Sequence, residues 1–205
     1  MNLNIIGIGP GNIDYILPIA KKKILESDLV LGFNRVLNDL VFLKNNKKFF
    51  LKSLKDIKNI VNKNLNKNIS IVASGDPGFY GILEYLKKNT KFKLNVLPGI
   101  SSLQYFCSKL NFSWFNIKFY TLHGRNFNNL INFEEDFDKI FILTDKINNP
   151  KKICEKLLNQ NYKIFIGENL SYKDEKIFIG KAKDLVNNNY KDLCVVIIEN
   201  ENFKR

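Results

Sequence analysis

The chain has 205 residues, of which 45% are hydrophobic and 25% charged, an ordinary composition for a globular protein. The start "MNLNIIGIGPGN" has no basic segment followed by a long apolar one, and no apolar run reaches the roughly 20 residues of a membrane helix. These features argue against a signal peptide and a membrane protein. We therefore expect a soluble, cytoplasmic protein of one or two domains.

The net charge of +12 raises the question of nucleic-acid binding. Lys and Asn are spread along the whole chain, as in "VNKNLNKN" and "LVNNNYKD", and there is no clustered Arg tract or basic-aromatic repeat. We therefore predict no nucleic-acid partner. A general positive field would also attract a small substrate that carries many carboxylates.

Cysteine and histidine usage argues against several kinds of site. Cys107, Cys154 and Cys194 are far apart and lack CxxC spacing, so neither a disulfide framework nor a zinc site is indicated. We expect them to be small buried residues. His123 is the only histidine, which disfavours a histidine metal site or a Ser-His-Asp triad elsewhere. We predict no metal.

Apolar strands alternate with helical segments in the first half of the chain. The strands are expected at residues 3–8, 28–33, 69–74 and 92–98, and the helices at 18–27, 35–43, 54–65, 78–88 and 100–110. Such alternation is typical of a parallel sheet that helices cover on both faces.

After Leu110 the pattern changes to strands separated by less helix. These strands are expected at residues 117–124, 139–145, 161–170, 175–180 and 193–200. We predict an α/β protein of two lobes, residues 1–112 with a mainly parallel sheet and residues 113–205 with a mixed one, and a boundary between about Leu110 and Ile117.

Three strands of the first lobe end in loops rich in Gly and Pro: "GIGPGN", "SGDPGFYG" and "LPGISS". Ligands of open parallel sheets bind beyond the carboxyl ends of the strands, and glycine lets the backbone approach them closely. Several such loops predict a common pocket. A dinucleotide fingerprint fails, because its third glycine would fall at Asn12 and no acidic residue ends the second strand.

The order and spacing of five motifs resemble the tetrapyrrole methylase family over nearly the full length. They are "GIGPG", "SGDPGFYG", "PGISSLQ", "LHGR" and "GENLSYKDEKI". The second, third and fourth are most similar to the branch that methylates C5 of cobalt-precorrin-7, a corrin-ring precursor in cobalamin biosynthesis. Since nothing follows Arg205, the chain resembles the standalone C5 enzyme without a fused, decarboxylating C15 domain.

The resemblance implies a two-lobed tetrapyrrole methylase fold, a homodimer, and S-adenosylmethionine as cofactor in the cleft between the lobes. It also implies a corrinoid substrate and leaves room for a separate C15-methylating decarboxylase partner. The positions that match the cofactor site of the family are Pro10, Gly75, Asp76, Phe79, Ser101, Ser102, Thr144 and Leu170; the last two depend on a looser alignment.

The loop residues each have an alternative role. Asp76 either faces the cofactor or caps a helix that begins near Gly78, and Ser101 and Ser102 either bind the cofactor or cap the next helix. His123 is either an ordinary polar residue or, with Arg125, a contact of the substrate. Arg125 is suited to bidentate binding of a carboxylate.

Aromatic residues supply candidates for a wall against a flat macrocycle. Phe79 and Tyr80 either form such a wall or anchor their helix, and Trp114 and Phe115 either contact the substrate or pack between the lobes. Methyl transfer is an in-line displacement that depends chiefly on approach of the reacting groups, so we single out no catalytic residue.

Two other functions stay open at this stage. Members of the same family methylate RNA or a protein, and the positive charge would suit RNA. A nucleotide-binding module without catalysis would also explain the glycine-rich loops.

Overall fold

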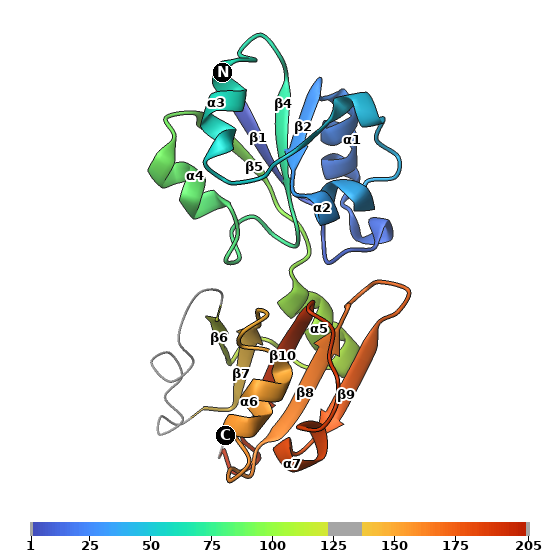
Figure 1. Cartoon of the computed structure of the whole chain (residues 1–205), viewed down its shortest axis with the longest axis vertical. Helices are drawn as coiled ribbons and strands as arrows, with labels where there is room; N and C mark the ends of the chain where they lie inside the picture. Colours follow the sequence, from blue (N-terminus) through green and yellow to red (C-terminus); the bar gives the residue numbers. More distant parts are fainter. Residues whose placement is uncertain (1, 123–136, 204–205) are drawn as a thin grey trace. The chain divides into compact units, whose positions relative to one another are not determined.

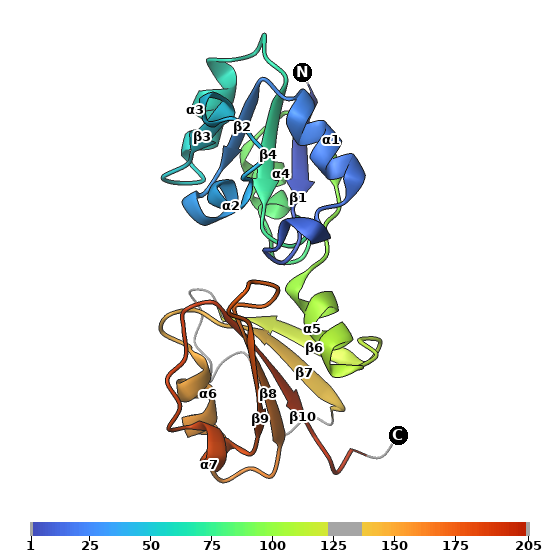
Figure 2. The same cartoon turned by 90° about the vertical axis from the view of Figure 1, so that its right-hand side faces the viewer.

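The computed structural model describes residues 2–122 and 137–203 (Figures 1 and 2). It divides into two compact units, Met1–Ser102 and Leu103–Arg205. Within the described ranges, no helix is both long and apolar enough to cross a membrane.

The described part of the first unit contains a five-stranded sheet in the order β3-β2-β4-β1-β5. All neighbouring strands pair in parallel, with Ile5 of β1 opposite Ile71 of β4 on one side and Val96 of β5 on the other. The strands are β1 (Asn2–Gly7), β2 (Leu29–Gly32), β3 (Lys48–Phe50), β4 (Ile69–Ala73) and β5 (Lys93–Leu97). This confirms the predicted parallel sheet.

Helices cover both faces of this sheet, as Figure 2 shows. The helices are α1 (Pro18–Glu26), α2 (Asn34–Asp39), α3 (Asp56–Asn62) and α4 (Leu83–Asn89), with the short 3-10 helices η1 (Ile13–Tyr15) and η2 (Asn45–Lys47). Apolar residues of α1 and α2 pack in one core cluster, and those of α3 and α4 in another. Because both faces are buried, β1 and β4 are mainly apolar without strict alternation, and their buried polar residues Asn4 and Ser70 are hydrogen-bonded.

Two local expectations for this unit were wrong. The helix expected from Gly78 begins only at Leu83, because the chain first makes a loop in which Tyr80 has a positive φ of 50°. The strand β3 was not predicted, since it has three residues and two of them, Phe49 and Phe50, are exposed. Neither the loop before α4 nor the strand β3 produces a hydrophobic pattern that identifies it in the sequence.

The described part of the second unit has a mixed five-stranded sheet in the order β6-β7-β10-β8-β9. Only the pair β6 and β7 is parallel, and the other neighbours are antiparallel. The strands are β6 (Ile117–Thr121), β7 (Lys139–Leu143), β8 (Lys163–Glu168), β9 (Lys176–Gly180) and β10 (Cys194–Glu199). The predicted mixed sheet is confirmed.

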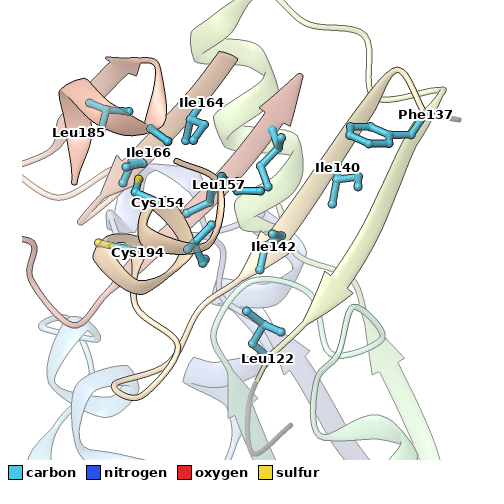
Figure 3. Close-up of a cluster of buried hydrophobic side chains, with 14 residues drawn as sticks. Leu122, Phe137, Ile140, Ile142, Cys154, Leu157, Ile164, Ile166, Leu185 and Cys194 are labelled. Carbon is cyan, nitrogen blue, oxygen red and sulfur yellow. The ribbon is translucent and has the colours of Figure 1, made fainter. Parts of the chain in front are cut away.

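The core of this unit lies between the sheet and two helices, α6 (Pro150–Lys156) and α7 (Ala182–Leu185). Figure 3 shows Cys154 and Cys194 among the aliphatic side chains of this cluster. Burial raises the pKa of Cys154 to about 11 and that of Cys194 to about 12. Cys107 is buried as well, and burial raises its pKa to about 11. All three therefore serve as small core residues, as predicted.

The helix α5 (Ser102–Leu110) belongs to the second unit, so the division falls at Ser102 and not at residue 112. Its Tyr105 donates a hydrogen bond to Glu175 at 2.7 Å. Phe112, which follows the helix, packs edge-on against Phe165 of β8 with 5.0 Å between the ring centroids. The change of sequence pattern after Leu110 marks the end of α5. The division between the units lies at the start of this helix, because α5 packs against the second unit.

Candidate functional site

The loops that follow β1 and β4 are joined through their backbones. Gly9 and Gly75 exchange two hydrogen bonds: Gly75 N donates to Gly9 O at 2.7 Å and Gly9 N to Gly75 O at 3.3 Å. Since β1 and β4 are parallel neighbours, their carboxyl ends meet at one edge of the sheet, and the two loops continue the pairing beyond it.

The loop after β5 meets the other two where three glycines lie in contact. A Cβ atom on Gly99 would lie 2.2 Å from Gly75 O, and one on Gly7 would lie 2.6 Å from Gly99 N. No side chain fits at either position. Gly75 also has a φ of +65°, which favours glycine. The structure thus brings together the three loops that the sequence singled out.

Asp76 ties the second loop to the third. Its Oδ1 accepts a hydrogen bond from Gly78 N at 2.7 Å, and its Oδ2 accepts one from Gly99 N at 3.0 Å. Because α4 starts at Leu83, Asp76 does not cap that helix, and the expected alternative was wrong. The carboxylate orders the loops, and its remaining lone pairs are still able to face a ligand.

The other residues predicted for the site in the first unit lie in or next to these three loops. Pro10 and Ser101 are buried, and Ser102 is the first residue of α5. Phe79 is half-buried and packs edge-on against the exposed Tyr80, with 5.3 Å between ring centroids. Trp114 and Phe115, in the second unit, are 53% and 88% exposed.

Thr144 and Leu170 lie at one edge of the second sheet. Strand β10 begins at Cys194 between the carboxyl ends of β7 and β8, with Val195 opposite Leu143 and Cys194 opposite Glu168. Thr144 Oγ1 donates to Cys194 O at 2.7 Å. Leu170 follows the end of β8 and is 5% exposed.

The motif "LHGR" begins at the same edge. Thr121, the last residue of β6, pairs with Leu143, and Leu122 N donates to Leu143 O at 2.9 Å. His123 and Arg125 lie outside the described residues.

The close contact of Gly7 with Gly99 and the hydrogen bonds of Glu175 were not predicted from the sequence. Both glycines lie in or next to quoted motifs, but only the sheet order reveals that they touch. Glu175 stands within "GENLSYKDEKI", and its partners come from α5 and from the turn after β8. The acidic pair Asp174–Glu175 in this motif could have drawn attention to Glu175, but the sequence does not indicate that it binds Tyr105 and Ser171.

The polar groups of the three loops suit a cofactor such as S-adenosylmethionine, which carries a sulfonium, an ammonium, a carboxylate and an adenosine. The loops of the first unit contain Gly9, Gly11 and Gly75, which have no side chain and all have positive φ, together with the Ser101 hydroxyl and the Asp76 carboxylate. Backbone amides and hydroxyls bind the polar groups of such a ligand, and a carboxylate suits a cation or a ribose hydroxyl.

Comparison with known proteins gives the same family as the motifs. Residues 2–186 match the model of the Tetrapyrrole (Corrin/Porphyrin) Methylases. A probable cobalt-precorrin-7 C(5)-methyltransferase of Methanocaldococcus jannaschii is 34% identical, over 96% of this chain and 97% of that protein.

Solved structures share the fold over the same extent. The precorrin-6Y methylase of Archaeoglobus fulgidus has a TM-score of 0.78 at 21% identity and covers 97% of this chain and 98% of its own. A uroporphyrin-III C-methyltransferase of Thermus thermophilus in complex with S-adenosyl homocysteine has a TM-score of 0.76 at 15% identity and covers 97% of each chain. The predicted two-lobed fold is confirmed. The chain belongs to the tetrapyrrole methylase family and is an S-adenosylmethionine-dependent methyltransferase.

Proposed function

We propose that the enzyme methylates C5 of cobalt-precorrin-7 in cobalamin biosynthesis. The observation that carries this proposal is the identity of 34% with the Methanocaldococcus protein of that name, which extends over nearly the whole of both chains. The motifs "SGDPGFYG", "PGISSLQ" and "LHGR" support the same branch of the family.

The cofactor supplies an electrophilic methyl group on its sulfonium, and the chain has to hold that group in line with an electron-rich ring carbon. Proximity and orientation account for most of the acceleration of such a displacement, so no acid-base pair is required. We assign the holding role to Pro10, Gly75, Asp76, Phe79, Ser101, Ser102, Thr144 and Leu170. The joined loops of the first unit support it, because backbone that is fixed before binding loses little entropy on binding.

Substrate recognition is assigned to His123 and Arg125. A corrinoid precursor carries several acetate and propionate carboxylates around its ring, and a guanidinium binds a carboxylate through two parallel hydrogen bonds. The assignment to these two residues comes from the motif "LHGR" and from this chemistry.

Arg125→Ala is expected to raise the KM for the corrinoid about tenfold, since a hydrogen bond to a charged group contributes about 1.5–3 kcal/mol. The affinity for S-adenosyl homocysteine should stay nearly constant. Arg125→Lys should recover only part, because an ammonium does not reproduce the two-pronged contact. The measurement is steady-state methylation together with calorimetry of cofactor binding.

Lys87→Ala is the matched control for loss of one positive charge. Lys87 is an exposed residue in the last turn of α4 and forms an ion pair with Glu84. If both Arg125 variants and this control behave like the wild type, Arg125 does not contact the substrate.

An acceptor panel tests the proposed substrate. Purified protein is incubated with methyl-labelled S-adenosylmethionine and, separately, with cobalt-precorrin-7, RNA or a protein extract, and NAD binding is titrated in parallel. Label should appear only in the corrinoid, and NAD should not bind. The charge of +12 makes RNA the alternative acceptor, and label in RNA alone would replace this proposal.

A homodimer, a cytoplasmic location and a separate decarboxylating C15 methylase are part of the same proposal. The family resemblance supports the homodimer and the separate methylase, and the lack of an apolar run as long as a membrane helix supports the location. Light scattering of the purified protein, alone and mixed with such a methylase, measures whether it is a dimer and whether the two associate; a monomeric mass would contradict the dimer.

A further inference from the structure

The turn after β8 holds two residues in an uncommon backbone conformation. Asn169 has a φ of 47° and Ser171 a φ of 71°, on either side of the buried Leu170. Non-glycine residues adopt positive φ at an energetic cost, and they keep it only where their surroundings hold them there. The contacts of this turn therefore decide whether it persists.

The first half of the turn is held by its own neighbours. Asn169 N donates to Leu193 O at 2.9 Å, and the buried Glu168 accepts a hydrogen bond from Lys191 N at 2.8 Å. Leu170 packs over Gly167, where an added Cβ would lie 2.7 Å from the Leu170 Cδ2 atom. These contacts hold the chain on the amino side of Leu170 and leave Ser171, on its carboxyl side, to be held by other groups.

Glu175 holds the second half of the turn. Its Oε2 accepts hydrogen bonds from Ser171 N at 2.6 Å and from the Tyr105 hydroxyl at 2.7 Å. Its Oε1 lies 3.3 Å from Lys109 Nζ. Tyr105 is 4% exposed and belongs to α5, so one carboxylate connects the turn to a packed helix.

The carboxylate is suited to this task because it stays ionised. Burial by itself raises the pKa of Glu175, but hydrogen bonds from Ser171 N, Tyr105 and Lys109 outweigh burial and hold the pKa below its usual value. An ionised carboxylate accepts hydrogen bonds at both oxygens, and such charge-assisted bonds are stronger than neutral ones.

We propose that Glu175 is a positioning residue for cofactor binding, which fixes the left-handed turn at residues 169–171 and thereby the place of Leu170. The proposal rests on the assignment of Leu170 to the cofactor site under the proposed function. Glu175 acts through the turn and does not itself touch the cofactor.

The test measures the dissociation constant for S-adenosyl homocysteine by calorimetry and the melting temperature by circular dichroism. Glu175→Ala should weaken binding about tenfold, because Ser171 N loses a charged acceptor and the turn relaxes. Once cofactor is saturating, kcat should stay within about twofold of the wild type, since the methyl-transfer geometry is restored when the cofactor is bound.

Two further variants separate the length of the side chain from its charge. Glu175→Gln keeps the length and an acceptor oxygen for Ser171 N but loses the charge, so its hydrogen bonds are weaker and binding should weaken by about threefold, less than in the alanine variant. Glu175→Asp keeps the charge but is one methylene too short to reach both donors, and it should bind as weakly as the alanine variant. Lys109→Met removes the partly exposed ion pair with Glu175 and the contact of Lys109 Nζ with the Tyr105 ring, but it leaves both hydrogen bonds of Glu175 Oε2 in place. As the control, it should change binding by about twofold or less.

The outcomes distinguish this inference from the proposed function. If the wild type binds no S-adenosyl homocysteine, the cofactor assignment itself fails. If the wild type binds and the alanine and aspartate variants bind equally well while folded, only the positioning role is overturned. Should the alanine variant fail to fold, the contrast between Gln and Asp decides: equal affinity of these two, each matching the wild type, overturns the proposal.

Discussion

Replacing Gly99 by alanine should lower the rate of methylation about 100-fold, as expected when reacting groups are displaced by about 1 Å. The new Cβ would lie 2.2 Å from Gly75 O and 2.8 Å from the carbonyl carbon of Gly7, so two loops have to move apart. Overpacking of this kind typically costs about 1–3 kcal/mol of unfolding free energy. Steady-state methylation measures the first effect and a thermal melt the second, and calorimetry with S-adenosyl homocysteine shows whether cofactor binding changes as well.

Gly180→Ala supplies the matched control. Gly180 ends β9, has no positive φ, and an added Cβ would make an ordinary contact at 3.5 Å with Leu185 Cγ. This variant should bind cofactor like the wild type. Unchanged binding and activity in Gly99→Ala would mean that the contact of the three loops does not shape the site.

Asp76→Ala should cost about 1.5–3 kcal/mol of unfolding free energy, since Gly78 N and Gly99 N lose a shared charged acceptor. The dissociation constant for S-adenosyl homocysteine should rise about tenfold or more, because the second and third loops are no longer tied. Asp76→Asn should recover part of both, as its single carbonyl oxygen accepts from one of the two amides.

Asp28→Ala separates loss of stability from loss of the site. Asp28 Oδ2 accepts a hydrogen bond from Asn68 N at 2.8 Å, just before β2 and β4 begin, so this bond joins two segments at the opposite edge of the same sheet. The control should lose stability but keep its cofactor affinity. If Asp76→Ala and Asp28→Ala bind the cofactor equally well, Asp76 contributes to stability but not to the cofactor site.

The sequence predicts the sheets well because burial on both faces leaves strands that are mainly apolar, as in "ISIVAS". Prediction from the sequence fails where the hydrophobic pattern covers few residues, or where contacts between distant residues determine the structure. The three residues of β3 are half exposed or exposed, and the loop before α4 contains a positive φ at Tyr80 that no helix pattern reveals. The division at Ser102 depends on contacts such as that of Tyr105 with Glu175, which are distant in sequence.

The candidate site was predictable as a set of loops but not as a set of contacts. Glycine and proline at three strand ends indicate where the backbone turns, and parallel pairing brings those ends together. That Gly99 N donates to Asp76 could not be read from the sequence, since 23 residues separate the two. The partners of Glu175 were hidden for the same reason.

The position of the transferred methyl group in the product is the most direct test of methylation at C5. Cobalt-precorrin-7 is incubated with the purified enzyme and S-adenosylmethionine that carries a 13C-labelled methyl group, and the product is examined by mass spectrometry and NMR. We expect one labelled methyl group, attached to C5 of the ring. A methyl group at another ring carbon, or no transfer to the corrinoid by an enzyme that does methylate RNA, would contradict methylation at C5.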